Sequence, residues 1–251
     1  NWYAYCGNDP INFTDPSGLE RIVVSGGAYN TNSNKSYQFE FIDTALKQLV
    51  EWQNATKDKI TWAVSTAGWE QNDLEQFQTV AENLNVNIFI FNNIEELVGY
   101  MNIGNNRPDD LITHFAAFSH GLNGSVEFGY YHDNAKDFSL TAEKIALLNT
   151  NAFSSEMISI FYSCNTGTNG TTSFAQAWSN VTGGQTRAIV GRSDYAKINS
   201  PSWYDWDMWL GYKVGRYIIG GYEVPAPSFK LPALGHRSDG KRSYWTTYHP
   251  N

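Results

Sequence analysis

The stretch 111-LITHFAAFSHG-121 is an apolar run that stops abruptly at His120 and Gly121. A second apolar run, 157-MISIFYSC-164, stops in the same way at Cys164. Continuous apolar runs of this length are typical of strands in a parallel sheet that is covered on both faces. Since the carboxyl ends of parallel strands meet at one edge of a sheet, we expect His120 and Cys164 to lie close together.

Strand and helix patterns alternate through the rest of the chain. We expect further strands at 21–27, 59–66, 86–91 and 186–194, and helices at 39–55, 73–85, 93–102, 138–149 and 171–181, with Asp73 as a helix N-cap and a polar hairpin at 125–133. This alternation predicts an α/β fold, a three-layer αβα sandwich around a mostly parallel sheet. Gly26 and Asp194 also lie at the carboxyl ends of predicted strands, so we expect them at the same edge as His120 and Cys164.

Composition narrows the function classes. The 251 residues fit one globular domain with an appendage, and the 41 % of hydrophobic residues suffice for a sizeable core. The formal net charge of -8 argues against a nucleic-acid partner. No apolar run approaches the roughly 20 residues of a membrane span, and we see no secretory leader at the start of the sequence.

His120 and Cys164 are the residue types of a nucleophilic site. A thiol attacks as its thiolate, and a nearby imidazole is a common means of producing one. We therefore predict that Cys164 attacks a carbonyl while His120 manages the protons of the thiol and the leaving group. The backbone N–H groups of Gly121 and Cys164 are expected to form an oxyanion hole. The alternative is that Cys164 is a buried hydrophobe and His120 a satisfied polar group.

Carboxylates near the predicted edge are candidates for substrate binding. Asp194 would favour Lys or Arg in a substrate through a charge-assisted hydrogen bond, and its alternative role is that of an ordinary strand-end residue. Asp205 and Asp207 are alternatives for the same task. No ligand spacing suggests zinc, and we expect neither a metal nor another cofactor.

Three other residues have reactive side chains, but we do not expect them to take part in catalysis. His114 lies in mid-strand with the side-chain parity of His120, and we expect it to be packed. Ser119 lacks the GxSxG elbow of a hydrolase nucleophile. Cys6 and Cys164 are the two cysteines of the chain, too few for a disulfide framework, so we do not expect them to be bridged.

The first nineteen residues are rich in turn signals and carry a longer motif. The pattern PxxxxDPxGL is filled by Pro10, Asp15, Pro16, Gly18 and Leu19. Together with the preceding NWYAYCGNDP, this segment resembles the end of the core of RHS-repeat proteins, in which a large β-cocoon encloses a variable C-terminal toxin. That core also resembles an aspartyl autoprotease that cuts after the final Leu of the motif.

The RHS resemblance implies a division of the chain. Residues 1–19 would be the remnant of the core, with Asp15 one of its catalytic carboxylates and Leu19 the residue before the cut. Residues 20–251 would be the toxin. The rest of the core is absent from this chain, so we do not expect it to cut itself at Leu19.

A second resemblance concerns the chemistry. The SHG and YSC strand ends, at His120 and Cys164, resemble the His-Gly and Cys blocks of the caspase-like cysteine peptidases. The order is the same, and the separation of 44 residues is near the roughly 50 of caspases. The resemblance implies a caspase-like fold and a cysteine endopeptidase. The residues around Cys164 are SCNTG and depart from the QACRG type, so a preference for Asp in the substrate is not implied.

These inferences combine into one expectation: a peptidase toxin that is released from an RHS shell and acts in the cytoplasm of a target cell on protein substrates. If the target is a competing bacterium, we also expect an immunity protein. Two rivals stay open. One keeps the Cys–His site for a deamidase or an acyl transferase. The other is a non-catalytic binding domain on the same fold, with its aromatic residues as the contact surface.

Overall fold

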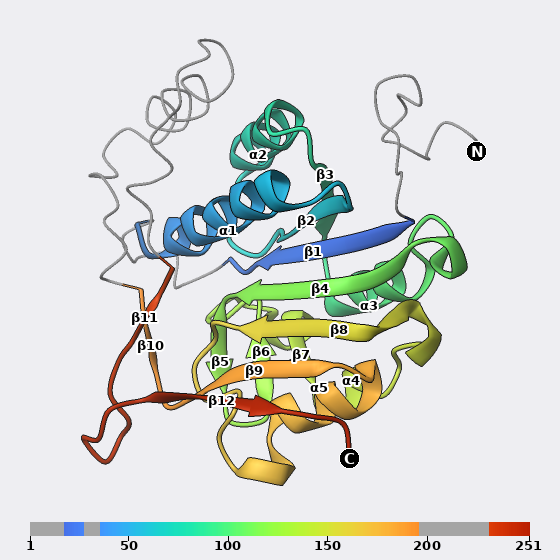
Figure 1. The fold of residues 1–251 in the computed structure, drawn as a ribbon. Helices are drawn as coiled ribbons and strands as arrows, with labels where there is room; N and C mark the ends of the chain where they lie inside the picture. Colours follow the sequence, from blue (N-terminus) through green and yellow to red (C-terminus); the bar gives the residue numbers. More distant parts are fainter. Residues whose placement is uncertain (1–17, 28–35, 196–230) are drawn as a thin grey trace.

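The computed structural model describes residues 18–27, 36–195 and 231–251. Seven strands form the central sheet: β1 (Leu19–Ser25), β2 (Lys59–Ser65), β3 (Asn87–Phe91), β4 (Leu111–Phe118), β8 (Phe153–Phe161), β9 (Gln185–Val190) and β12 (Tyr244–Tyr248). Their spatial order is β12-β9-β8-β4-β1-β2-β3, and every pair is parallel except β12 with β9 (Figure 1).

Helices cover both faces of this sheet. They are α1 (Ser36–Ala55) and α2 (Gln71–Asn83) on one face, and α3 (Ile94–Ile103), α4 (Ala142–Ile145) and α5 (Phe174–Thr182) on the other. Short 3-10 turns are η1 (Arg107–Asp109), η2 (Ala135–Phe138), η3 (Thr150–Ala152) and η4 (Gly170–Thr172). The predicted three-layer αβα sandwich with a mostly parallel sheet is therefore confirmed.

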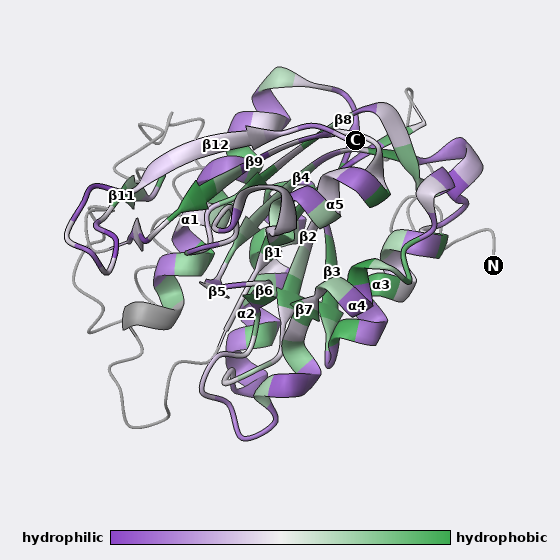
Figure 2. Ribbon diagram, turned by 90° about the horizontal axis from the view of Figure 1, so that it is seen from below, coloured by the Kyte–Doolittle hydropathy of each residue, from purple (hydrophilic) through white to green (hydrophobic). Residues whose placement is uncertain are grey.

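Each face of the sheet has its own core, with a fully buried tryptophan in it. Trp62 lies under α1 and α2, and Trp178 of α5 packs against the other face. Their indole N–H groups donate to Ser25 Oγ and Ser159 Oγ at 2.7 and 2.8 Å, so neither ring buries an unpaired donor. Figure 2 shows hydrophobic residues along the central strands and hydrophilic ones on the outer sides of the helices.

Two small sheets accompany the central one in the described residues. β5 (His120–Leu122), β6 (Ser125–Glu127) and β7 (Ser139–Thr141) form an antiparallel sheet of three strands. β10 (Ser193–Asp194) pairs antiparallel with β11 (Ala233–Leu234). The chain thus continues past β4 and past β9 into these small sheets, and Val126 and Leu140 of the first one pack into the core on the face covered by α3, α4 and α5.

The predicted helix at 138–149 is wrong for most of its length. Only Ala142–Ile145 is α-helical, and the residues before it form β7. The hydroxyls of Ser125 and Ser139 both donate to the Glu127 carboxylate, which ties β7 to β6. Thr141 then caps α4 by accepting from the Lys144 N–H at 3.4 Å.

Two smaller expectations also need correction. The predicted hairpin at 125–133 is one strand, β6, followed by turns, because β6 pairs with β5 and β7 instead. Asp73 is not the N-cap of α2: Glu70 holds that position, and its backbone N–H donates to the Asp73 carboxylate at 3.1 Å. This reciprocal arrangement is a capping box.

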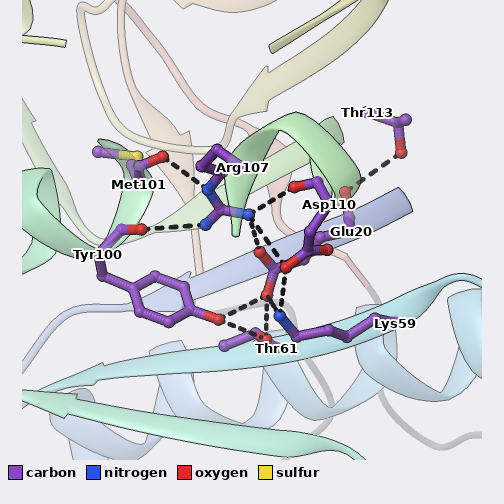
Figure 3. A network of polar contacts seen from close by, with 8 residues as sticks. All are labelled: Glu20, Lys59, Thr61, Tyr100, Met101, Arg107, Asp110 and Thr113. Carbon is purple, nitrogen blue, oxygen red and sulfur yellow. Dashed lines mark hydrogen bonds and ion pairs between the residues drawn. The ribbon is translucent and has the colours of Figure 1, made fainter. Parts of the chain in front are cut away.

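A buried polar network closes the amino end of the sheet, opposite the edge that carries His120. Its members are Glu20, Lys59, Thr61, Tyr100, Arg107 and Asp110 (Figure 3). Glu20 is fully buried and forms ion pairs with Lys59, at 3.1 Å, and with Arg107. Burial by itself would raise the pKa of Glu20, but the two cations, together with the hydrogen bonds from Thr61 and Tyr100, outweigh burial and lower it.

Candidate active site

The register of β4 against β8 determines where the His120 and Cys164 segments lie relative to each other. The two strands pair in parallel with one offset of 44 residues from His114–Ile158 to Ala117–Phe161. Beyond the last pair, the Tyr162 N–H still donates to the Ala117 carbonyl at 3.0 Å. The two strands therefore leave the sheet side by side and in step.

The same offset continues to the predicted dyad. Ser119 Oγ lies 3.0 Å from Ser163 Oγ, and these serines directly precede His120 and Cys164. Gly121 packs against the backbone of Cys164 so closely that a Cβ at this position would collide with the Cys164 carbonyl oxygen. The structure therefore brings the Ser119–Gly121 and Ser163–Cys164 segments together, and glycine is required at 121.

His120 stands in an aromatic enclosure. Its ring lies 5.0 Å from the ring of Phe41 of α1 and 4.8 Å from that of Tyr130. Burial lowers the pKa of His120 to about 4. The imidazole is therefore neutral near pH 7, which is the form that accepts a proton.

Cys164 is half-buried and has a free thiol. Two groups of Ser193, on β10, approach its sulfur: the hydroxyl at 3.2 Å and the backbone N–H, which donates at 3.3 Å. Sequence reasoning missed Ser193, although it directly precedes the predicted Asp194. The available signal was its place at the end of the strand that follows the Cys strand.

Tyr195 is buried near Cys164. Its hydroxyl donates to the Tyr162 carbonyl at 3.3 Å, and its ring lies 4.9 Å from that of Phe41. Burial first, and the neighbouring Cys164 second, raise the pKa of Tyr195 well above its usual value. The phenol therefore stays protonated and is a structural contact of the site rather than a base.

Asp194 lies near a second carboxyl group that the sequence did not reveal. Glu40 of α1 has its pKa raised to about 7, by burial and then by the charge of Asp194. The two acids come from elements far apart in the sequence. A helix periodicity assigns Glu40 to α1 but gives no indication that α1 begins beside β10.

The remaining candidates are placed as follows. His114 packs in mid-strand, with its ring 5.8 Å from that of Trp52 and Nδ1 3.1 Å from Thr113 Oγ1, as expected. Leu19 opens β1. The predictions for Cys6, Asp15, Asp205 and Asp207 lie outside the described residues.

Within the described ranges, no three His, Cys, Asp or Glu side chains are grouped so that they could hold a metal ion. In the same part of the chain, no helix combines the length and the apolar character needed to cross a bilayer.

Comparison with known proteins adds no assignment. No family model matches the chain, and a search of curated proteins finds no match.

Proposed function

We propose that this protein is a cysteine endopeptidase with Cys164 as nucleophile and His120 as general acid and base. The observation that carries the proposal is the continued β4–β8 register, because it leads both residues out of the sheet in step and at its carboxyl edge. Parallel α/β sheets bind their ligands at this edge. The free thiol and the neutral imidazole suit the two roles.

The reaction proceeds in two halves. The proton of the Cys164 thiol passes to His120, and the resulting thiolate then attacks the substrate carbonyl carbon to form a C–S bond. His120 then gives this proton to the scissile nitrogen as the C–N bond breaks, so the amine leaves and a thioester remains on Cys164. Water attacks the thioester as His120 takes its proton, the C–S bond breaks to release the acid product, and His120 returns the proton to the sulfur. The N–H groups of Gly121 and Cys164 are the proposed donors to the oxyanion, since the two backbones lie in contact.

Lys or Arg is the proposed side chain before the scissile bond. Two carboxyl groups support this. Asp194 directly follows Ser193, whose N–H donates to the Cys164 sulfur, and Glu40 lies close enough to Asp194 for the charge of Asp194 to raise its pKa. At pH 7 Glu40 is close to half ionised, so the pair carries more negative charge as the pH rises. An ammonium or guanidinium group would relieve the repulsion between the two acids.

The biological setting is proposed from residues 1–19 alone. The PxxxxDPxGL pattern supports a toxin that is released from an RHS shell by a cut after Leu19 and delivered into a target-cell cytoplasm. An immunity protein would protect the producing cell.

Expression of the wild type and of Cys164→Ala in the same host tests the proposal. We expect growth arrest with the wild type only, while both proteins show the same thermal unfolding. A folded and fully toxic Cys164→Ala protein would refute it. Intact-mass analysis of purified target proteins separates the reactions, because a peptidase cuts the chain, whereas a deamidase or acyl transferase changes its mass without a cut.

A further inference from the structure

The sulfur of Cys164 has contacts that the Cys–His scheme does not use. Ser193 approaches it with two groups at once, the hydroxyl at 3.2 Å and the backbone N–H at 3.3 Å. The backbone N–H can only donate, and the hydroxyl can rotate to donate as well. Two donors from one residue thus converge on the atom that becomes negative when the thiol loses its proton.

Ser193 is held firmly in this position. β10 pairs with β11, with Ser193 opposite Leu234. On the residue before it, the Arg192 carbonyl accepts from the Gly235 N–H at 2.9 Å, and the Arg192 N–H donates to Ser243 Oγ at 2.7 Å. The C-terminal segment therefore fixes the backbone that delivers the N–H to the sulfur.

No positive charge near pH 7 comes from four described neighbours of this site, which are His120, Tyr195, Glu40 and Asp194. His120 is neutral near pH 7 because burial lowers its pKa to about 4. Tyr195, which contributes its ring from the end of β10, stays protonated. Glu40 of α1 and Asp194 of β10 are acids. Among these neighbours, hydrogen-bond donors are what can stabilise a thiolate, and charge-assisted bonds of this kind are about twice as strong as neutral ones.

We propose that Ser193 stabilises the negative charge on Cys164 Sγ by donating both its backbone N–H and its hydroxyl as the thiol proton leaves. The inference rests on the proposed role of Cys164 as nucleophile. In the step concerned, the S–H bond breaks, an N–H bond forms on His120, and the electron pair stays on the sulfur. Substitution of the side chain removes one of the two donors and leaves the other.

The test is the pH dependence of Cys164 alkylation by iodoacetamide, followed by mass spectrometry of the Cys164 peptide so that Cys6 does not contribute. In Ser193→Ala we expect the midpoint to rise by about one pH unit, which is about a tenfold loss of thiolate below the midpoint. Ser193→Thr keeps the hydroxyl and should keep the wild-type midpoint. Ser154→Ala, at the opposite end of β8, is the matched control.

Valine has the shape of threonine but lacks the hydroxyl. If Ser193→Ala does not fold, the alkylation midpoints of Ser193→Thr and Ser193→Val are compared to test the role of the hydroxyl. The shift should persist in a Glu40→Gln background, since Glu40 titrates near pH 7. Equal midpoints in the Thr and Val proteins would overturn the role of Ser193. That result would leave the peptidase proposal standing if Cys164→Ala is inactive. A Ser193-dependent midpoint together with a fully toxic Cys164→Ala protein would instead refute the peptidase.

Discussion

At the scale of single residues, the burial of His120 links stability to pH. Its pKa is about 4 in the folded protein and near 6.5 in an unfolded chain. Between these values the unfolded chain binds the extra proton and the folded protein does not. The contribution of the neutral His120 is therefore complete above pH 6.5 and is lost as the pH falls toward 4.

We predict that His120→Asn weakens this dependence. Urea unfolding at about pH 7 and about pH 5 should show a smaller loss of unfolding free energy in the variant than in the wild type. His114 has the same pKa and remains in both proteins, so it contributes an equal background. An unchanged difference between the two pH values would show that His120 is not buried in its neutral form.

The acidic pair gives a second prediction at this scale. Asp194→Asn should lower kcat/KM for peptides with Lys or Arg before the scissile bond by about 10- to 100-fold, because it removes a charge-assisted partner. We expect the wild-type KM for these peptides to fall as the pH rises through 7, because Glu40 gains its charge there, and Glu40→Gln should abolish this change. The comparison is with peptides that carry Ala at the same position. Equal losses for the Lys and Ala peptides would contradict a basic specificity.

At the scale of elements, the buried network of Figure 3 fixes the amino end of β1. Removal of one partner from a buried ion pair leaves an uncompensated charge. We predict that Arg107→Met lowers the unfolding free energy by about 3–5 kcal/mol, because the fully buried Glu20 loses its guanidinium partner.

The exposed pair Lys144–Glu95 is the control for this prediction. Lys144→Ala should cost about 1 kcal/mol or less, since surface ion pairs contribute little. Urea denaturation measures both variants. Similar effects of the two substitutions would mean that the network does not stabilise β1.

The position of Leu19 also has a consequence at this scale. The bond from Leu19 to Glu20 lies inside β1, which pairs with β2 and β4 on its two sides. A protease needs an extended, unpaired segment, so the proposed cut after Leu19 would have to precede the folding of β1 into the sheet. We predict that a glutamate-specific protease spares the Glu20–Arg21 bond in the folded protein and cuts it in urea. Rapid cleavage of this bond without urea would contradict the claim that the cut after Leu19 precedes the folding of β1.

The helices and strands also show which features of the fold sequence patterns can predict and which they cannot. The apolar face of α1, with Phe39, Ile42, Leu46, Leu49 and Val50, is buried as its periodicity predicted. β7 was missed because FSLTAEKIALLN has a helical period, whereas the Glu127 carboxylate draws Ser139 into strand pairing. β12 was missed because it is an edge strand whose partner, β9, lies far away in the sequence. Local periodicity does not encode such long-range pairing.

At the scale of the whole molecule, the strand order explains why distant residues share a site. The chain runs outward through β1, β2 and β3, returns to β4 on the other side of β1, and continues through β8 and β9. The order of the parallel strands made the meeting of the His120 and Cys164 segments predictable. The contacts of Ser193, Tyr195 and Glu40 were not predictable, because they depend on how β10 and α1 pack at the sheet edge. Only the strand-end position of Ser193 could be read from the sequence.

The central claim is that Cys164 and His120 cut proteins, and identification of new protein N-termini in expressing cells tests it most directly. Cells that express the wild type should contain new termini, with Lys or Arg as the residue before each cut. Cells that express Cys164→Ala or His120→Ala at the same level should lack them. The same set of termini in wild-type and Cys164→Ala cells would contradict the account.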